Sequence, residues 1–192
     1  SHPGQQPPKF LKNLGPSGSY HFEDKSVSAG LVWRESFASP SLGDFDNDGY
    51  LDIFFTSCYS GDESILMRNN GDWTFSEISS DNILVYANFQ STWADYDNDG
   101  DLDLLSGNRL FRNPGTGGHW LKVKLIGNGT TVNKAAIGAK VLINLGDSKR
   151  MIRQVEGGTG ENNQNDLTLH FGLGNHNDTV TLNITWPNGT VQ

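Results

Sequence analysis

The chain of 192 residues is poor in several features that define common protein classes. It has a single cysteine, Cys58, so no disulfide can form within it. No run approaches the roughly 18 consecutive apolar residues that a membrane-spanning helix needs. Basic residues are also few, with 14 Lys and Arg against 22 Asp and Glu. The resulting net charge of −8 argues against nucleic-acid binding, because such a surface repels phosphate groups.

The motifs of familiar catalytic sites are missing as well. No Gly-x-Ser-x-Gly elbow occurs, and the glycine-rich segment 157–160 lacks the Lys-Ser/Thr pair of a phosphate loop. His119 and His170 have no Cys or His partner at zinc spacing, and both fit structural positions in strands. We therefore predict no catalytic residue and interpret the chain as a non-enzyme.

Glycine, by contrast, is abundant, with 23 residues, and charged residues make up only 19% of the chain. This composition favours many short strands joined by turns. The clearest strand pattern is at residues 180–186, where apolar and polar residues alternate strictly. Such a strand has one buried and one solvated face, as in an antiparallel sheet. No amphipathic helical pattern is found.

An internal repeat defines the organisation of the chain. The segment that begins at Asp44 recurs about 50 residues later at Asp95, and a period of that length built from strands is typical of β-propeller blades. We predict an all-β protein with propeller-blade-like antiparallel repeats followed by an antiparallel β-sandwich-like domain. The predicted boundaries are an irregular N-terminal arm at residues 1–9, two repeats at 10–114 and a β domain at 115–192.

Each repeat contains an acidic loop of the form Asp-x-Asp-x-Asp-Gly-x-x-Asp. Ca²⁺ takes six to eight oxygen ligands, and alternate aspartates in a tight loop direct several carboxylates at one centre. Without a cation these carboxylates would repel one another or stay protonated. The predicted ligands are the side chains of Asp44, Asp46, Asp48 and Asp52 with the carbonyl of Tyr50, and the side chains of Asp95, Asp97, Asp99 and Asp103 with the carbonyl of Asp101. We expect about two Ca²⁺ ions.

Two other interpretations of the loops are weaker. An EF-hand needs a bidentate Glu at its twelfth position, where Phe55 and Ser106 stand here. The residues after each loop also have the pattern of strands and not of a helix. A solvated turn would explain one such loop, but two matching copies in register argue against it.

Four Asn-x-Ser/Thr sequons occur in the second half of the chain. They are predicted glycosylation sites for a eukaryotic protein. The four are Asn128, Asn177, Asn183 and Asn188.

The acidic loops resemble those of FG-GAP/VCBS repeats, and residues 69–75 are similar to the Asn-Asn-Gly-Asp-Gly-Thr-Phe segment of that family, with Trp73 replacing a glycine. The second half resembles the ASPIC/UnbV domain. Its matching segments are residues 119–123, 137–141, 170–174 and 186–189, whereas residues 158–161 depart from that domain's Gly-Ser-Gly-Tyr. The resemblance implies a secreted or cell-surface protein that binds calcium, associates with matrix or cells and has no catalytic activity.

The leading hypothesis is therefore a calcium-binding extracellular adhesion or matrix module that contacts a protein or glycan partner. A propeller closes with at least four blades and only two repeats are present, so open β edges favour self-assembly. The second hypothesis is thus a self-assembling structural glycoprotein, such as a fibre or surface-layer subunit. A third, a carbohydrate-binding accessory domain, depends on Trp33 and Trp73 as exposed aromatic residues.

Overall fold

A computed structural model describes residues 9–31, 34, 36–78, 83, 85–115, 117–146, 149–160 and 162–192. These residues form fourteen short strands and one 3-10 turn, and no α-helix occurs among them, which confirms the predicted all-β class. Residues 1–8 of the predicted arm, together with Trp33 and Glu161, lie outside the described residues. The described part of the chain also contains no helix with the length and hydropathy of a membrane span.

Each strand is three to seven residues long. They are β1 (Leu11–Asn13), β2 (Phe22–Asp24), β3 (Phe37–Gly43), β4 (Asp52–Ser57), β5 (Ile65–Asn69), β6 (Phe75–Ile78), β7 (Ser91–Ala94), β8 (Asp103–Ser106), β9 (Arg109–Phe111), β10 (His119–Val123), β11 (Lys140–Asn144), β12 (Arg150–Gln154), β13 (Leu169–Gly174) and β14 (Thr181–Thr185), and the 3-10 turn η1 covers Pro16–Gly18.

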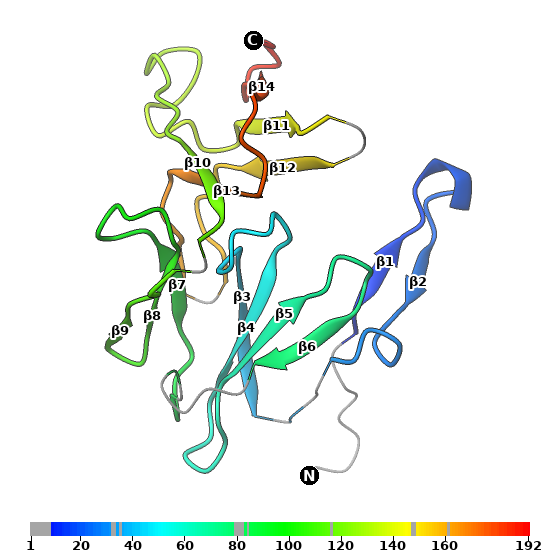
Figure 1. Cartoon of the computed structure of the whole chain (residues 1–192), viewed down its shortest axis with the longest axis vertical. Helices are drawn as coiled ribbons and strands as arrows, with labels where there is room; N and C mark the ends of the chain where they lie inside the picture. The colour runs from blue at the N-terminus through cyan, green and yellow to red at the C-terminus, as the bar shows by residue number, and fades with distance from the viewer. Residues whose placement is uncertain are drawn as a thin grey trace.

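The two repeats form two antiparallel meanders. The first has the strand order β3-β4-β5-β6 and the second the order β7-β8-β9, while β1 and β2 form a separate hairpin. The two meanders stand side by side, with β3 and β7 as neighbouring inner strands (Figure 1). Each acidic loop connects the first and second strands of its meander, so the strands on either side fix where the loop begins and ends.

A hydrophobic cluster fills the space between the two meanders. Phe54 and Leu66 from the first contact Trp93, Leu102 and Leu104 from the second, and all five are buried. Successive side chains along a strand point to opposite faces of the sheet, so one face of each meander supplies this core. The two repeats are thereby packed as adjacent blades.

The C-terminal region, residues 119–192, has its own core and lies at one end of the two meanders (Figure 1). Strand β10 pairs with β13, and β11 pairs with both β12 and β14. Val141, Ile143 and Phe171 are fully buried between these strands. No described sheet pairs a strand before residue 115 with one after it.

Candidate calcium sites

The two acidic loops, residues 44–52 and 95–103, have nearly the same backbone shape. Asn47 and Asn98 have φ angles of 59° and 61°, and Gly49 and Gly100 have φ angles of 89° and 96°. Positive φ is readily adopted by glycine and, among other residues, most often by Asn and Asp. The Asn-Asp-Gly sequence in each loop therefore gives the sharp curl that brings successive aspartates together.

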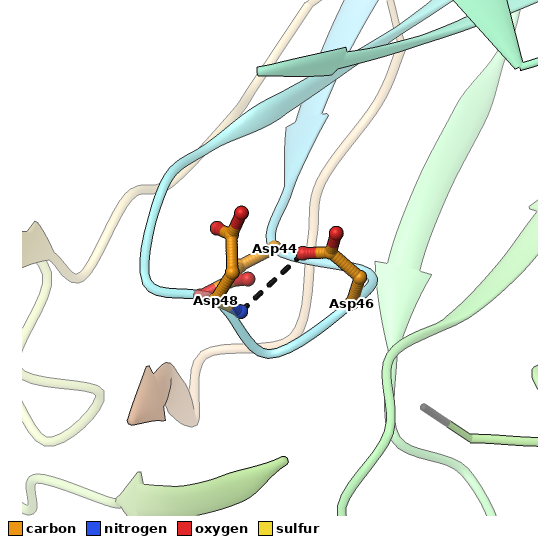
Figure 2. Close-up of side chains that lie close together, drawn as sticks. All are labelled: Asp44, Asp46 and Asp48. Carbon is orange, nitrogen blue, oxygen red and sulfur yellow. Dashed lines mark hydrogen bonds between the residues drawn. The ribbon is translucent and has the colours of Figure 1, made fainter. Parts of the chain in front are cut away.

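Three aspartates of each loop converge. Asp44, Asp46 and Asp48 each place a carboxylate oxygen within 4.8 Å of the other two, and the second loop does the same with its three matching aspartates, Asp95, Asp97 and Asp99. Figure 2 shows the Asp46 and Asp48 side chains rising from one turn, with the Asp48 N–H donating to Asp46 Oδ1 at 3.3 Å. The turn thus places several hard oxygen ligands around one small space.

The first aspartate of each loop has one oxygen without a partner. Asp44 Oδ2 accepts the N–H of Gly49 at 3.0 Å, and Asp95 Oδ2 accepts the N–H of Gly100 at 3.1 Å. The other oxygen, Oδ1, is buried in both residues and has no hydrogen-bond partner. A buried carboxylate oxygen without a partner is unfavourable, and a cation coordinated by the three aspartates would satisfy it. The residues present therefore fit Ca²⁺.

The last predicted side-chain ligand of each loop has a different position. Asp52 is fully buried and accepts the N–H groups of Phe45 at 3.1 Å and Asn69 at 2.8 Å. Asp103 accepts the N–H groups of Tyr96 and Asn113 in the same way. These two carboxylates close the base of each loop and lie outside the groups of three.

Tyr50 and Asp101 take part through their backbone N–H groups. The N–H of Tyr50 donates to Asp48 Oδ1 at 2.9 Å, and the N–H of Asp101 donates to Asp99 Oδ1 at 3.1 Å. These bonds orient the third aspartate of each loop. Coordination by the carbonyls of Tyr50 and Asp101 stays a prediction.

The pKa values of the buried aspartates reflect their surroundings. Burial, and to a smaller extent the neighbouring carboxylates, raises the pKa of Asp44 to about 6 and that of Asp52 to about 8. Burial also raises the pKa of Asp103. A divalent cation bound nearby would favour the ionised form of these carboxyls and lower their pKa values.

Two arginines beside the loops were not assigned a role from sequence. Arg68 Nε lies 2.6 Å from Asp46 Oδ2, and Arg112 Nε lies 2.6 Å from Asp97 Oδ2. Arg112 Nη2 also reaches Asp99 Oδ2 at 2.7 Å. The signal was present in the sequence, because an Arg-Asn pair recurs at the same place in both repeats.

The four sequons and the aromatic residue of the third hypothesis lie at the surface. All four sequon asparagines are exposed; they are Asn128, Asn177, Asn183 and Asn188. Trp73 is 49% exposed, and Lys12 Nζ lies 4.4 Å from the centre of its ring. The lysine therefore occupies one face of the Trp73 ring, which a bound sugar would need. Glycosylation of the four asparagines stays a prediction.

Comparison with known proteins finds a matching family for part of each half of the chain. The family described as FG-GAP-like repeat matches residues 44–106, and the family described as ASPIC and UnbV matches residues 129–192, which confirms the resemblance seen in the sequence. Cartilage acidic protein 1 of Homo sapiens is 30% identical over 206 residues, and that of Mus musculus is 27% identical over the same length. Each alignment covers 95% of this chain and 30% of the relative. The chain thus spans about 30% of the length of these curated relatives.

Proposed function

We propose that the chain is a calcium-binding extracellular matrix module without catalytic activity. Two of its segments match the FG-GAP-like repeat and the ASPIC and UnbV families. It is also similar along 95% of its length to part of cartilage acidic protein 1. The relatives are named for cartilage, a tissue made largely of extracellular matrix. A secreted or cell-surface location and a protein or glycan partner outside the cell follow from the same proposal.

One observation carries the calcium part of the proposal. In each loop three aspartate oxygens lie within 4.8 Å of one another, and the buried Oδ1 of the first aspartate has no partner. The two loops repeat this arrangement from different sequence contexts, so a chance cluster of surface acids is a poor explanation. Oxygen-only ligands favour a hard cation, and a flexible cage of carboxylates suits Ca²⁺ better than Mg²⁺.

The ion would act on the fold and would not take part in a reaction. When bound, Ca²⁺ supplies two positive charges at the centre of each loop. Asp44 directly follows β3 and Asp52 begins β4, so a fixed loop fixes the spacing of the two strands. The ordered meanders then present a rigid surface to the partner.

Calorimetric titration with CaCl₂ tests this proposal. The wild-type chain is expected to bind about two ions, and Asp48→Asn and Asp99→Asn are each expected to leave about one, because each removes a carboxylate from one group of three. Asp178→Asn, an exposed aspartate far from both loops in sequence, is the control and should bind two. Absence of calcium binding by the wild-type chain would contradict the proposal.

A second candidate function, self-assembly, is favoured by one face of the second meander. Phe54 and Leu66 are a cross-strand pair in the first meander and are 0% and 6% exposed. Their counterparts, Leu105 and Leu110, form the same pair in the second meander but are 46% and 51% exposed. This apolar face lacks the cover that the second meander gives to the first, so a second copy of the chain is the candidate occupant.

Sedimentation velocity over a range of concentrations distinguishes this second candidate. Self-association that is lost in Leu105→Lys supports assembly through the β8–β9 face. A wild-type chain that stays monomeric at high concentration argues against it, and the calcium proposal is unaffected by either result.

A further inference from the structure

The C-terminal region contacts the first acidic loop directly. The N–H of Gly172 in β13 donates to Asp44 Oδ2 at 3.0 Å, and the N–H of Gly174 donates to the carbonyl of Asn47 at 2.7 Å. Arg153 from β12 reaches the carbonyl of Gly49 at 3.5 Å and lies 3.8 Å from Asp44 Oδ2. Donors from two strands of this region therefore end on the loop that we propose to hold calcium.

The second loop is contacted in an equivalent way. Lys122 Nζ from β10 lies 2.8 Å from Asp95 Oδ2 and 2.9 Å from Asn98 Oδ1. His170 Nε2 from β13 lies 2.9 Å from the carbonyl of Gly100. Burial lowers the pKa of His170, so the ring is neutral and its Nε2–H donates to that carbonyl.

The two loops are also linked to each other beneath the C-terminal region. Asn47 of the first loop donates through Nδ2 to Asp101 Oδ1 at 2.8 Å and to the carbonyl of Gly100 at 3.3 Å. Asn47 is completely buried there. The loops and strands β10 and β13 thus form one contiguous polar contact.

Two glycines of this contact are closely approached by groups from the other side. A Cβ atom added at Gly172 would lie 2.4 Å from Asp44 Oδ2 and from the backbone of Asn47. A Cβ atom added at Gly100 would overlap the indole of Trp120. At these two points a movement of the loop would displace β13 or β10, because closely packed groups transmit displacement.

The first aspartate of each loop, Asp44 or Asp95, belongs both to its group of three aspartates and to the contact with the C-terminal region. One oxygen of Asp44 and one of Asp95 accept hydrogen bonds from the C-terminal region, and the other oxygen of each is buried and has no hydrogen-bond partner. Hydrogen bonds to the second oxygen of a metal-binding carboxylate fix its orientation and strengthen metal binding. The same carboxylate can thus be oriented from one side by the C-terminal region and from the other by an ion.

We propose that the two acidic loops form a calcium-dependent joint, in which bound Ca²⁺ holds the C-terminal region against the repeats and the docked region in turn strengthens calcium binding. The inference rests on the proposed calcium binding. Coupling of this kind is reciprocal, so the factor by which calcium favours docking equals the factor by which docking strengthens calcium binding. The joint would let calcium concentration outside the cell determine whether the two halves act as one rigid unit.

Hydrogen exchange of the wild-type chain, measured by NMR with and without CaCl₂, is the first test. Removal of calcium is expected to speed exchange of the Gly172 and Gly174 amides about tenfold or more, since both donate to the first loop. Amides of the β11–β12 ladder are the internal control and should keep their rates, because undocking leaves the C-terminal core intact.

Calcium titration of two variants is the second test. Gly172→Ala is expected to weaken binding at one site about tenfold by displacing β13 from Asp44, and Gly158→Ala, whose added Cβ meets only one atom at 3.9 Å, is its control. His170→Ala is expected to weaken the other site by removing the donor to Gly100, with the exposed His119→Ala as control.

The outcomes separate the joint from calcium binding itself. If the wild-type chain binds two ions but its amide exchange does not depend on calcium, the joint is overturned and the proposed function stands. The same holds if both variants bind calcium as tightly as the wild-type chain. Tighter binding in the variants overturns the joint as well. A wild-type chain that binds no calcium overturns both.

Discussion

At the scale of single residues, the two oxygens of a carboxylate have separate roles in the acidic loops. In Asp97, for example, Oδ1 accepts the N–H of Asp99 at 3.3 Å, whereas Oδ2 receives Arg112 Nε at 2.6 Å. The arginine lowers the pKa of Asp97 and keeps it ionised, as a calcium ligand must be. Its own side chain is about half exposed, so the ion pair is partly screened by water.

Replacement of Arg112 by glutamine tests this role. In the calcium-free protein the arginine is a nearby positive charge for Asp97 and Asp99, so Arg112→Gln is expected to lower the free energy of unfolding slightly. With calcium bound, the ion supplies most of the neutralising charge and the loss is expected to be smaller. Thermal denaturation with and without calcium measures both values. Arg109→Gln is the control, because Arg109 is an exposed residue of β9. Equal losses with and without calcium would contradict the expectation.

The raised pKa values predict how calcium stabilisation depends on pH. Asp44 and Asp52, with pKa values of about 6 and about 8 in the folded calcium-free chain, hold protons that the unfolded chain has lost above the ordinary value of 3.8. The stability of the calcium-free chain is therefore expected to fall as pH rises from about 4 through about 8. Calcium binds ionised carboxylates, so the gain in melting temperature on adding calcium should be larger at pH 8 than at pH 5. An equal gain at both pH values would show that these carboxyls do not bind the ion.

At the scale of strands, close contact between the inner strands positions the two loops relative to each other. Trp93 in β7 packs against Gly43 in β3, and its Nε1 donates to Ser41 Oγ at 3.1 Å. Ser41 Oγ also lies 2.7 Å from Ser91 Oγ. Glycine in a strand interior marks a place where another group approaches the backbone, which is the case here.

Gly43→Ala tests the packing of the two meanders. The added Cβ would lie 2.7 Å from the Trp93 ring, so the indole or the strand must shift. The free energy of unfolding, measured by urea denaturation, is expected to fall by about 1–3 kcal/mol, as for other overpacked cores. Gly61→Ala, where an added Cβ meets nothing within 4 Å, should leave it nearly unchanged. A Gly43→Ala chain as stable as wild type would mean that the meanders are not closely packed.

At the scale of the whole molecule, residues 163–165 connect the C-terminal region to both meanders. Asn163 Oδ1 accepts the N–H of Ser91, and Asn165 Oδ1 accepts the N–H of Trp93 at 3.0 Å. Asn165 Nδ2 donates to the carbonyl of Leu42 at 3.1 Å. The segment therefore lies along the inner strands of both meanders and ties the C-terminal region to them.

Asn165→Ala is expected to weaken this connection. The substitution removes one acceptor and one donor and leaves the partly buried N–H of Trp93 unpaired, at a cost of about 1–3 kcal/mol in the free energy of unfolding. Urea denaturation measures the loss, and Asn177→Ala, an exposed asparagine in the same region, is the control. Equal stability of the two variants would show that the segment does not hold the halves together.

Much of the fold and of the site follows from local sequence. The alternation at residues 180–186 predicted strand β14, and the Asp-Asn-Asp-Gly pattern predicted two curled loops whose glycines need positive φ. These features depend only on the conformation of neighbouring residues. The grouping of three aspartates in each loop was predictable for the same reason, and the repeat made it more specific.

The sequence could not predict the partners of those aspartates across the molecule. Nothing in the spacing of Lys122 or Gly172 indicates that they bond to Asp95 and Asp44, because the contacts join residues 27 and 128 positions apart. The positions of Asp52 and Asp103 beneath the loops, facing backbone N–H groups, are equally a result of strand pairing.

By itself the sequence determined the alternating strands, the two acidic loops and their carboxylate groups, since turn geometry and ligand chemistry are local properties. Only the tertiary structure decided that both loops lie under the C-terminal region, with one oxygen of Asp44 and of Asp95 bonded to it. The physical reason is that packing between meanders and domain depends on long-range complementarity of shape and charge, which no short segment encodes.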